Sequence, residues 1–227
     1  MRKEKSFLEL LHARRKNLDI EQSWGLQDAT LLSYEMSFQA LLRSGDLNKI
    51  LREIKFSGNG NKTYTLDLMG SGSAIEEIEN ADYILGVELT NRNYLSSKRR
   101  SIITGDIISK TTWKIIREWI DKESHGNRTT FDLITCRPEG GIHTLPDNYS
   151  LFQFFFEQSL KLLGDHGVLI TQLPGSLSGS DGQITISSWI KRMEKDQKIS
   201  IRYQSSASTG STNTISAILV QKDAPYT

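Results

Sequence analysis

A glycine-rich turn at the end of a short apolar run constrains the fold of this chain more than any other feature. Residues 65–74 combine apolar side chains, the acid Asp67 and two glycines, Gly70 and Gly72, with Ser71 between them. Glycine lets the backbone approach a ligand closely, and the first turn of a following helix offers N–H groups that have no helical acceptor. This pattern predicts a buried strand that runs into a nucleotide-binding turn.

A second acidic residue lies at the position that a nucleotide-binding turn requires. The apolar run over residues 83–87 ends in Glu88, which lies 18 residues after Gly70. An acid at that distance, at the end of the next strand, is placed to accept hydrogen bonds from ribose hydroxyls. The turn and Glu88 together predict a site for an adenosine-containing cofactor.

Short apolar runs recur along the chain and indicate a sheet. They are near-continuous rather than alternating, as in parallel strands that are buried on both faces. Segments with helical periodicity separate most of the runs, and this alternation predicts a doubly wound sheet with its ligand site at the carboxyl ends of the strands. The runs cover residues 64–69, 83–88, 101–107, 131–136 and 167–173.

The carboxyl-terminal part has a different pattern. A helix is expected near residues 183–196, and apolar runs follow at 199–205 and 215–220. The polar segment 206–213 between these runs has no helical period, so the two strands are expected to pair antiparallel. The predicted fold class is α/β: a Rossmann-like, doubly wound, mostly parallel seven-stranded sheet with a C-terminal antiparallel hairpin.

Helical periodicity over residues 6–56 predicts helices before the first strand. We therefore expect two parts, an N-terminal helical extension or cap at residues 1–57 and a Rossmann-like domain at residues 63–222. One apolar stripe of the extension consists of Leu31, Leu32, Phe38, Leu41 and Leu42, and the next consists of Leu47, Ile50, Leu51 and Ile54.

Composition and charge describe an ordinary globular protein. The formal net charge is +1, which gives no overall attraction to nucleic acid or to a membrane surface. Cys136 is the only cysteine, so an internal disulfide is impossible and a reducing, cytoplasmic setting is expected. The sequence contains no run of about 18 apolar residues, and its histidines are too dispersed to predict a metal site.

The order of these landmarks resembles that of the class I S-adenosylmethionine-dependent methyltransferases. The resemblance covers roughly residues 63–222 and includes the terminal hairpin, which distinguishes this family from other Rossmann-like folds. The similar segments are the turn at residues 66–73, Glu88, the Gly105-Asp106 pair after the third strand, the strand and loop at 131–138, and residues 162–170.

The resemblance implies S-adenosylmethionine as the cofactor and methyl transfer as the activity. In this family the acid after the second strand binds ribose, here Glu88, and the acid after the third strand binds the adenine amino group, here Asp106. The residues that the resemblance assigns to the cofactor are Asp67, Gly70, Ser71, Gly72, Glu88, Leu89, Gly105, Asp106, Ile107 and Arg137.

The glycine turn departs from the family pattern. The family usually places glycines two, four and six residues after the first acid, whereas Gly70 and Gly72 lie three and five residues after Asp67. Either the turn is one residue tighter than in the family, or Asp67 does not have the role of the family's first acid. A binding or regulatory protein on a methyltransferase scaffold therefore stays open as an alternative.

The loop after the fourth strand is expected to line the site of methyl transfer. This reaction needs mainly the positioning of a nucleophile and the exclusion of water, and a base only where the nucleophile must lose a proton. Glu139 or His143 is the candidate proton acceptor, and Arg137 is the candidate partner of an anionic substrate group. Trp24 and Tyr34, in the helical extension, are candidates for covering the pocket.

The acceptor is expected to be a small molecule, because the chain has no basic surplus and residues 137–141 do not match the Asn-Pro-Pro-aromatic loop of base methylation. RNA and protein acceptors stay open. A nicotinamide-dependent oxidoreductase is a less favoured alternative, because Ile75 stands at the third glycine position of the dinucleotide motif and the terminal hairpin argues against it.

Replacement of Glu88 by alanine tests the cofactor assignment. The variant loses a charge-assisted hydrogen bond to ribose, so S-adenosylmethionine should bind more weakly by roughly 1–3 kcal/mol, measured by titration calorimetry. Unchanged affinity in a folded variant would remove Glu88 from the site.

Overall fold

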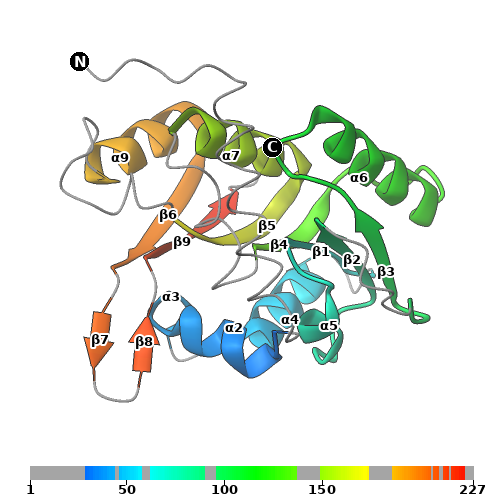
Figure 1. Cartoon of the computed structure of the whole chain (residues 1–227), viewed down its shortest axis with the longest axis horizontal. Coiled ribbons are helices and arrows are strands. Elements are labelled where there is room, and N and C mark those ends of the chain that lie inside the picture. The colour runs from blue at the N-terminus through cyan, green and yellow to red at the C-terminus, as the bar shows by residue number, and fades with distance from the viewer. Residues whose placement is uncertain are drawn as a thin grey trace.

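The computed structural model shows a seven-stranded sheet between two layers of helices (Figure 1). The structure describes residues 29–43, 46–57, 62–89, 96–136, 149–173, 186–205, 207–209, 212–214 and 216–222. The strands of the sheet are β1 (Tyr64–Leu68), β2 (Tyr83–Glu88), β3 (Arg100–Thr104), β4 (Phe131–Cys136), β5 (Leu163–Gln172), β6 (Ile199–Gln204) and β9 (Ala217–Lys222).

The strand order is β3-β2-β1-β4-β5-β9-β6. Parallel pairs join β3, β2, β1, β4 and β5, whereas β9 pairs antiparallel with both β5 and β6. The direction of winding reverses at β1, because β2 and β4 lie on its two sides, and ligands of such sheets bind beyond the carboxyl ends of the strands at that point. This arrangement confirms the predicted fold class, including the antiparallel C-terminal hairpin.

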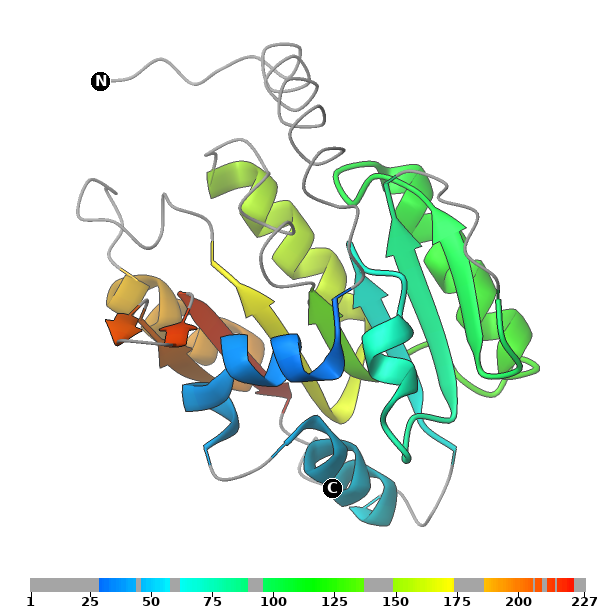
Figure 2. The same ribbon diagram turned by 60° about the horizontal axis from the view of Figure 1, so that its bottom comes forward.

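The helices form one layer on each face of the sheet (Figures 1 and 2). The first layer consists of α6 (Lys110–Glu123), α7 (Tyr149–Leu162) and α9 (Ile186–Gln197). The second layer consists of α2 (Leu31–Ser37), α3 (Gln39–Leu42), α4 (Leu47–Ser57) and α5 (Ser73–Glu76). Only α5 of this second layer follows β1 in the sequence.

Aromatic side chains hold the first layer against the sheet. Phe152 and Phe156 of α7 are fully buried, and their ring centroids lie 5.7 and 5.0 Å from that of Trp189 in α9. In α6, Trp113 packs against Phe155, with ring centroids 6.3 Å apart. Full burial of such a ring contributes roughly 1.5–3 kcal/mol, so these side chains anchor three helices to one face.

Helices from before β1 cover the opposite face, because the chain between β1 and β2 provides only the four-residue α5. Tyr34 and Phe38 are fully buried in one apolar cluster with the strand residues Ile84, Leu133 and Ile170. The face that α5 leaves uncovered is therefore closed by α2, α3 and α4.

The two predicted stripes of the extension have different outcomes. The α4 stripe is confirmed, since Leu47 and Leu51 are buried and Ile50 and Ile54 pack against the same cluster. The assignment of Leu32 to the other stripe is wrong: its side chain is 64% exposed, because it lies on the outer side of α2. Residues 6–28 lie outside the described residues, and the division into residues 1–57 and 63–222 stays a prediction.

β5 begins earlier than the sequence pattern predicts. Phe131 pairs with Leu163 and Leu133 pairs with Val168, so β5 accommodates a bulge opposite the start of β4. Within the bulge His166 has a φ of 62°, which is a left-handed conformation. The bulge interrupts the apolar run, and the sequence pattern therefore indicates only the part from residue 167 onward.

The polar segment 206–213 contains two short strands rather than a plain loop. They are β7 (Ala207–Thr209) and β8 (Thr212–Thr214), which pair antiparallel as a separate small sheet. Three-residue strands of small and polar residues give no periodic apolar signal, so the sequence does not reveal them.

Gln204, the last residue of β6, joins the second helical layer to the sheet. Its side-chain oxygen accepts hydrogen bonds from the backbone N–H groups of Ala40 and Leu41, at 3.0 and 3.3 Å. Its side-chain nitrogen donates to the carbonyl oxygen of Ser37, at 2.7 Å. The buried amide thus satisfies backbone groups at the junction of α2 and α3.

Replacement of Gln204 by leucine should lower the free energy of unfolding by roughly 1–3 kcal/mol, because it leaves buried backbone groups without partners. Urea unfolding measures the change. Gln221→Leu, at an exposed position of β9, is the matched control and should cost little. Equal stability of the two variants would show that the Gln204 amide does not hold α3 in place.

Candidate cofactor site

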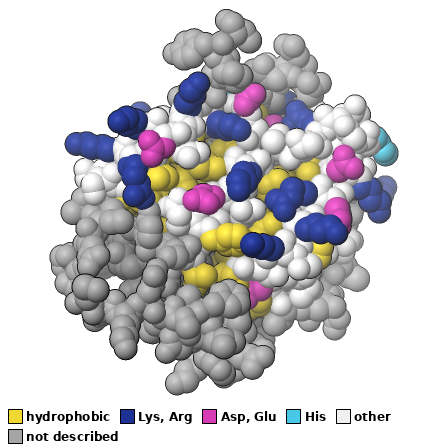
Figure 3. Space-filling model, turned by 90° about the horizontal axis from the view of Figure 1, so that it is seen from above, with side chains coloured by type: hydrophobic (Ala, Val, Ile, Leu, Met, Phe, Trp, Pro, Cys, Tyr) yellow, Lys and Arg dark blue, Asp and Glu magenta, His cyan; other side chains and the backbone are white. Residues whose placement is uncertain are grey.

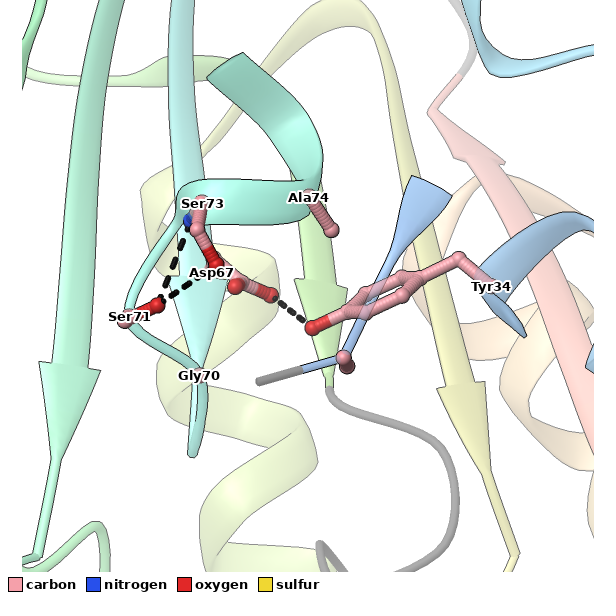
Figure 4. A pocket seen from close by; sticks show the side chains of 7 residues that line it. Tyr34, Asp67, Gly70, Ser71, Ser73 and Ala74 are labelled. Carbon is pink, nitrogen blue, oxygen red and sulfur yellow. Dashed lines mark hydrogen bonds between the residues drawn. The ribbon is translucent and has the colours of Figure 1, made fainter. Parts of the chain in front are cut away.

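The carboxylate of Asp67 lies at the centre of the candidate site. Asp67 is only 1% exposed, and it faces the α2 side of the sheet because its neighbours Leu66 and Leu68 point into the opposite cluster. One carboxylate oxygen accepts hydrogen bonds from the Tyr34 hydroxyl and the Thr135 hydroxyl, both at 2.8 Å. Figure 4 shows the phenol of Tyr34 reaching from α2 to Asp67.

The second oxygen of Asp67 shapes the glycine turn. It accepts a hydrogen bond from the backbone N–H of Gly72, at 3.0 Å. A Cβ atom on Gly70 would lie 2.2 Å from this oxygen and 2.8 Å from the Tyr34 hydroxyl. Gly70 is thus required by the packing of the turn on its own strand, and any contact that it makes with a cofactor is additional.

The shifted glycine spacing has a structural counterpart. Met69, two residues after Asp67, has a φ of 59°, and Gly72 has a φ of 76°. Met69 therefore adopts a left-handed conformation at the position where the resembled family usually has its first glycine. A positive φ is strained for a residue with a side chain and is not strained for glycine. The turn therefore carries strain at Met69 but not at Gly72.

The turn lies directly against β2. A Cβ atom on Gly86 would come within 2.4 Å of the carbonyl carbon and oxygen of Ser71. The sequence pattern contains Gly86 only as part of an apolar run and does not reveal this role. Because Gly86 has no side chain, the backbone of the turn can pass directly against the backbone of β2. The turn therefore lies between the ends of β1 and β2.

Two arginines hold the short helix after the turn. The guanidinium of Arg99 donates to the carbonyl oxygens of Glu76, Ile78 and Ala81, at 2.6, 3.4 and 3.0 Å. Arg100 forms an ion pair with the side chain of Glu76, at 3.0 Å. These contacts satisfy carbonyl groups at the end of α5 and fix its orientation.

The predicted ribose and adenine residues lie at the ends of β2 and β3, which are adjacent strands. Glu88 is 5% exposed, and its backbone oxygen accepts a hydrogen bond from the N–H of Gly105, at 2.8 Å. Leu89 follows it and is partly exposed. The structure therefore brings Glu88, Leu89 and the Gly105 segment to the same end of the sheet as Asp67.

Asp106 and Ile107 form a tight turn before α6. One carboxylate oxygen of Asp106 accepts from the N–H of Ile108, at 3.2 Å. The backbone oxygen of buried Ile107 accepts from the indole nitrogen of Trp113, at 2.6 Å. The residue that caps α6 is Ser109 and not Asp106.

A small pocket lies between α2 and the glycine turn. The side chains as they stand leave no space in it for a water molecule. The described lining contributes one carboxylate and no basic side chain. The lining residues are Ala29, Tyr34, Asp67, Gly70, Ser71, Ser73 and Ala74; six of them are labelled in Figure 4.

Several predicted residues have no described structure. Arg137, Glu139 and His143, the candidate catalytic residues, lie outside the described residues, and so does Trp24. Tyr34, predicted as a pocket cover, does line the pocket. Sequence reasoning did not predict the contact between Thr135 and Asp67. Its only signal in the sequence is a hydroxyl-bearing residue next to the end of an apolar strand.

No group of three His, Cys, Asp or Glu side chains in the described part of the chain could hold a metal ion. None of the described helices is both long and apolar enough to span a membrane.

Comparison with known proteins identifies the fold. No family model and no curated protein matches the sequence. The magnesium protoporphyrin IX methyltransferase of Synechocystis PCC 6803, solved with S-adenosylmethionine, superimposes with a TM-score of 0.50 over 98% of this chain and 100% of that chain, at 11% identity. This chain has the class I methyltransferase fold.

A second solved methyltransferase is also similar in shape. It is the amino pentose methyltransferase CalS10 of Micromonospora echinaspora, with a TM-score of 0.48, 12% identity, and coverage of 86% of this chain and 99% of that chain. At 11% identity, the fold is what this chain shares with the Synechocystis enzyme.

Gly86→Ala tests the close approach of the turn to β2. The added methyl group has no space beside Ser71, so the free energy of unfolding should fall by roughly 1–3 kcal/mol in urea unfolding. Gly164→Ala is the matched control, because its Cβ would approach nothing closer than 3.1 Å. A Gly86 variant as stable as the Gly164 variant would contradict the packing of the turn.

Proposed function

We propose that the protein binds S-adenosylmethionine and transfers its methyl group to a small molecule. The observation that carries this proposal is the acidic pocket at the glycine turn, in which Asp67 and Tyr34 face Gly70, Ser71 and Ser73. A pocket lined by a carboxylate favours a small cationic group, such as the ammonium of an amino acid.

The cofactor fits the residues that are present. Its methionine end carries an ammonium group, which the Asp67 carboxylate in the lining of this pocket attracts. Glu88 is proposed to accept from the ribose hydroxyls. Asp106, Ile107, Gly105 and Leu89 are proposed to border the adenine, and the remaining proposed cofactor contacts are Gly70, Ser71, Gly72 and Arg137.

The same pocket argues against the alternative of a nicotinamide-dependent oxidoreductase. In dinucleotide enzymes the diphosphate lies against the glycine turn, where helix N–H groups stabilise its negative charge. Here a carboxylate lies beside the turn, and it already accepts from the N–H of Gly72. Repulsion between that carboxylate and a diphosphate disfavours such a cofactor.

Methyl transfer requires few chemical groups from the protein itself. When bound, the cofactor supplies an electrophilic methyl group on its sulfonium. The chain has to position the acceptor, exclude water and remove a proton where the acceptor carries one. Glu139 or His143 is proposed for the proton and Arg137 for an anionic group of the acceptor.

A small molecule is proposed as the acceptor rather than a nucleic acid. On the outer face of α6, α7 and α9, Lys and Arg side chains are interspersed with Asp and Glu (Figure 3). Lys114 and Glu118 on this face form an ion pair, at 3.5 Å. Mixed charge of this kind gives no continuous basic surface for phosphates. A cytoplasmic location, proposed from the single cysteine Cys136, agrees with a metabolic acceptor.

Tyr34→Phe tests the proposed cofactor pocket. The variant removes the hydroxyl that orients the Asp67 carboxylate, so S-adenosylmethionine and S-adenosylhomocysteine should bind about tenfold more weakly, the equivalent of one hydrogen bond. Titration calorimetry measures both affinities, and wild-type protein should show no binding of NAD.

Tyr203→Phe is the matched control, because Tyr203 is an exposed tyrosine on β6. It should leave both affinities unchanged. Binding of NAD in place of S-adenosylmethionine would overturn the proposed cofactor. Cofactor binding without methyl transfer to any acceptor would instead favour the regulatory alternative.

A further inference from the structure

The side-chain amide of Gln172, the last residue of β5, is not explained by the fold. Its oxygen is buried and has no hydrogen-bond partner in the part of the chain that the structure describes. A buried acceptor without a partner costs roughly 1–3 kcal/mol, and proteins seldom keep one without a reason. The residue as a whole is partly exposed, so it lies at the margin of the core and not within it.

Gln172 lies on the same face of the sheet as the cofactor pocket. Ile170, two residues earlier in β5, belongs to the cluster beneath α2 and pairs with Thr135 of β4. Because side chains alternate along a strand, Gln172 points to the side of Ile170. Gln172 therefore continues the face on which Thr135 binds Asp67, one step closer to the carboxyl edge.

Polar neighbours along this edge differ from Gln172 in having partners. Asp67 accepts from Tyr34, Thr135 donates to Asp67, and the amide of Gln204 binds α3. Gln172 stands between them in the strand order, on β5 between β4 and β9. Among Asp67, Thr135, Gln172 and Gln204, Gln172 is thus the side chain without such a contact, and it lies on the strand next to β4.

The position of the amide suits contact with the methyl acceptor. β5 is two strands from β1, which corresponds to about 10 Å at the usual spacing of neighbouring strands. Figure 2 shows α2 crossing in front of β5, whose carboxyl end continues beyond the helix. A small molecule beside the methionine end of the cofactor site lies within reach of that end.

The chemistry around Gln172 indicates an uncharged group. Ala217, its partner in β9, and Ile170, the preceding residue on the same face of β5, carry no charge. An amide matches a hydroxyl or another amide, which donate and accept, and this match holds whichever way the oxygen and nitrogen of Gln172 are assigned.

We propose that Gln172 binds an uncharged hydroxyl or amide group of the methyl acceptor. This inference rests on the proposed function and narrows it to acceptors that carry such a group near the methylated atom. Its direct consequence is that Gln172 contributes to acceptor binding and neither to the fold nor to cofactor binding.

Gln172→Leu, which keeps the size of the side chain and removes the amide, tests the inference, with Gln221→Leu as the matched control. Three quantities are measured for each protein: urea unfolding, calorimetric affinity for S-adenosylmethionine, and transfer of tritiated methyl from S-adenosylmethionine to a small-molecule extract of the producing cells. Dilution of the extract separates acceptor binding from maximal rate.

Gln172→Leu should unfold no more easily than wild type and should bind S-adenosylmethionine within about twofold, because no hydrogen bond within the protein is lost. Its labelling of the extract should fall at least about tenfold at low extract concentration and less at high concentration. Gln221→Leu should match wild type in all three measurements.

Two results for Gln172→Leu would contradict the proposed role of Gln172 and leave the proposed function intact. They are labelling equal to that of wild type, or a loss of stability comparable to that of Gln204→Leu. Absence of labelling by wild-type protein, with or without binding of S-adenosylmethionine, would instead remove the proposed function, and the role of Gln172 with it. Labelling of acceptors that lack hydroxyl and amide groups would overturn the proposed acceptor class.

Discussion

Hydrogen bonds to the buried carboxylate of Asp67 join three segments that are distant in the sequence. They come from Tyr34 in α2, from the backbone of Gly72 in the turn and from Thr135 in β4. A carboxylate removed from water is costly unless hydrogen bonds replace its hydration. The position of α2, the shape of the turn and the end of β4 are therefore fixed together, and they enclose the acidic pocket.

The short connection between β1 and β2 explains why the N-terminal helices belong to the site. With only four residues in α5, most of one sheet face needs cover from elsewhere. Packing of α2 to α4 on that face supplies the cover and brings Tyr34 to Asp67. Gln204 anchors the far end of the same layer. Stability and the proposed cofactor recognition thus depend on the same helices.

The fold was predictable from the sequence because it follows from local patterns. Apolar runs mark the buried parallel strands, and Glu88 and Asp106 follow strands whose carboxyl ends must meet. The contacts within the site were not predictable in the same way. Tyr34 and Thr135 meet Asp67 across 33 and 68 residues, and no periodicity encodes a partner at that distance. The amide oxygen of Gln172, which has no partner among the described residues, becomes visible only once the strands around it are assembled.

The most direct test of the acidic pocket compares two ligands that differ in the amino-acid head. S-adenosylhomocysteine carries the ammonium group and 5′-methylthioadenosine lacks it, while both have adenosine and an uncharged sulfur. If Asp67 and Tyr34 recognise that head, calorimetry on the wild-type protein should show S-adenosylhomocysteine binding at least about tenfold more tightly. Equal affinities would contradict the role of the pocket and leave recognition to the adenosine residues alone.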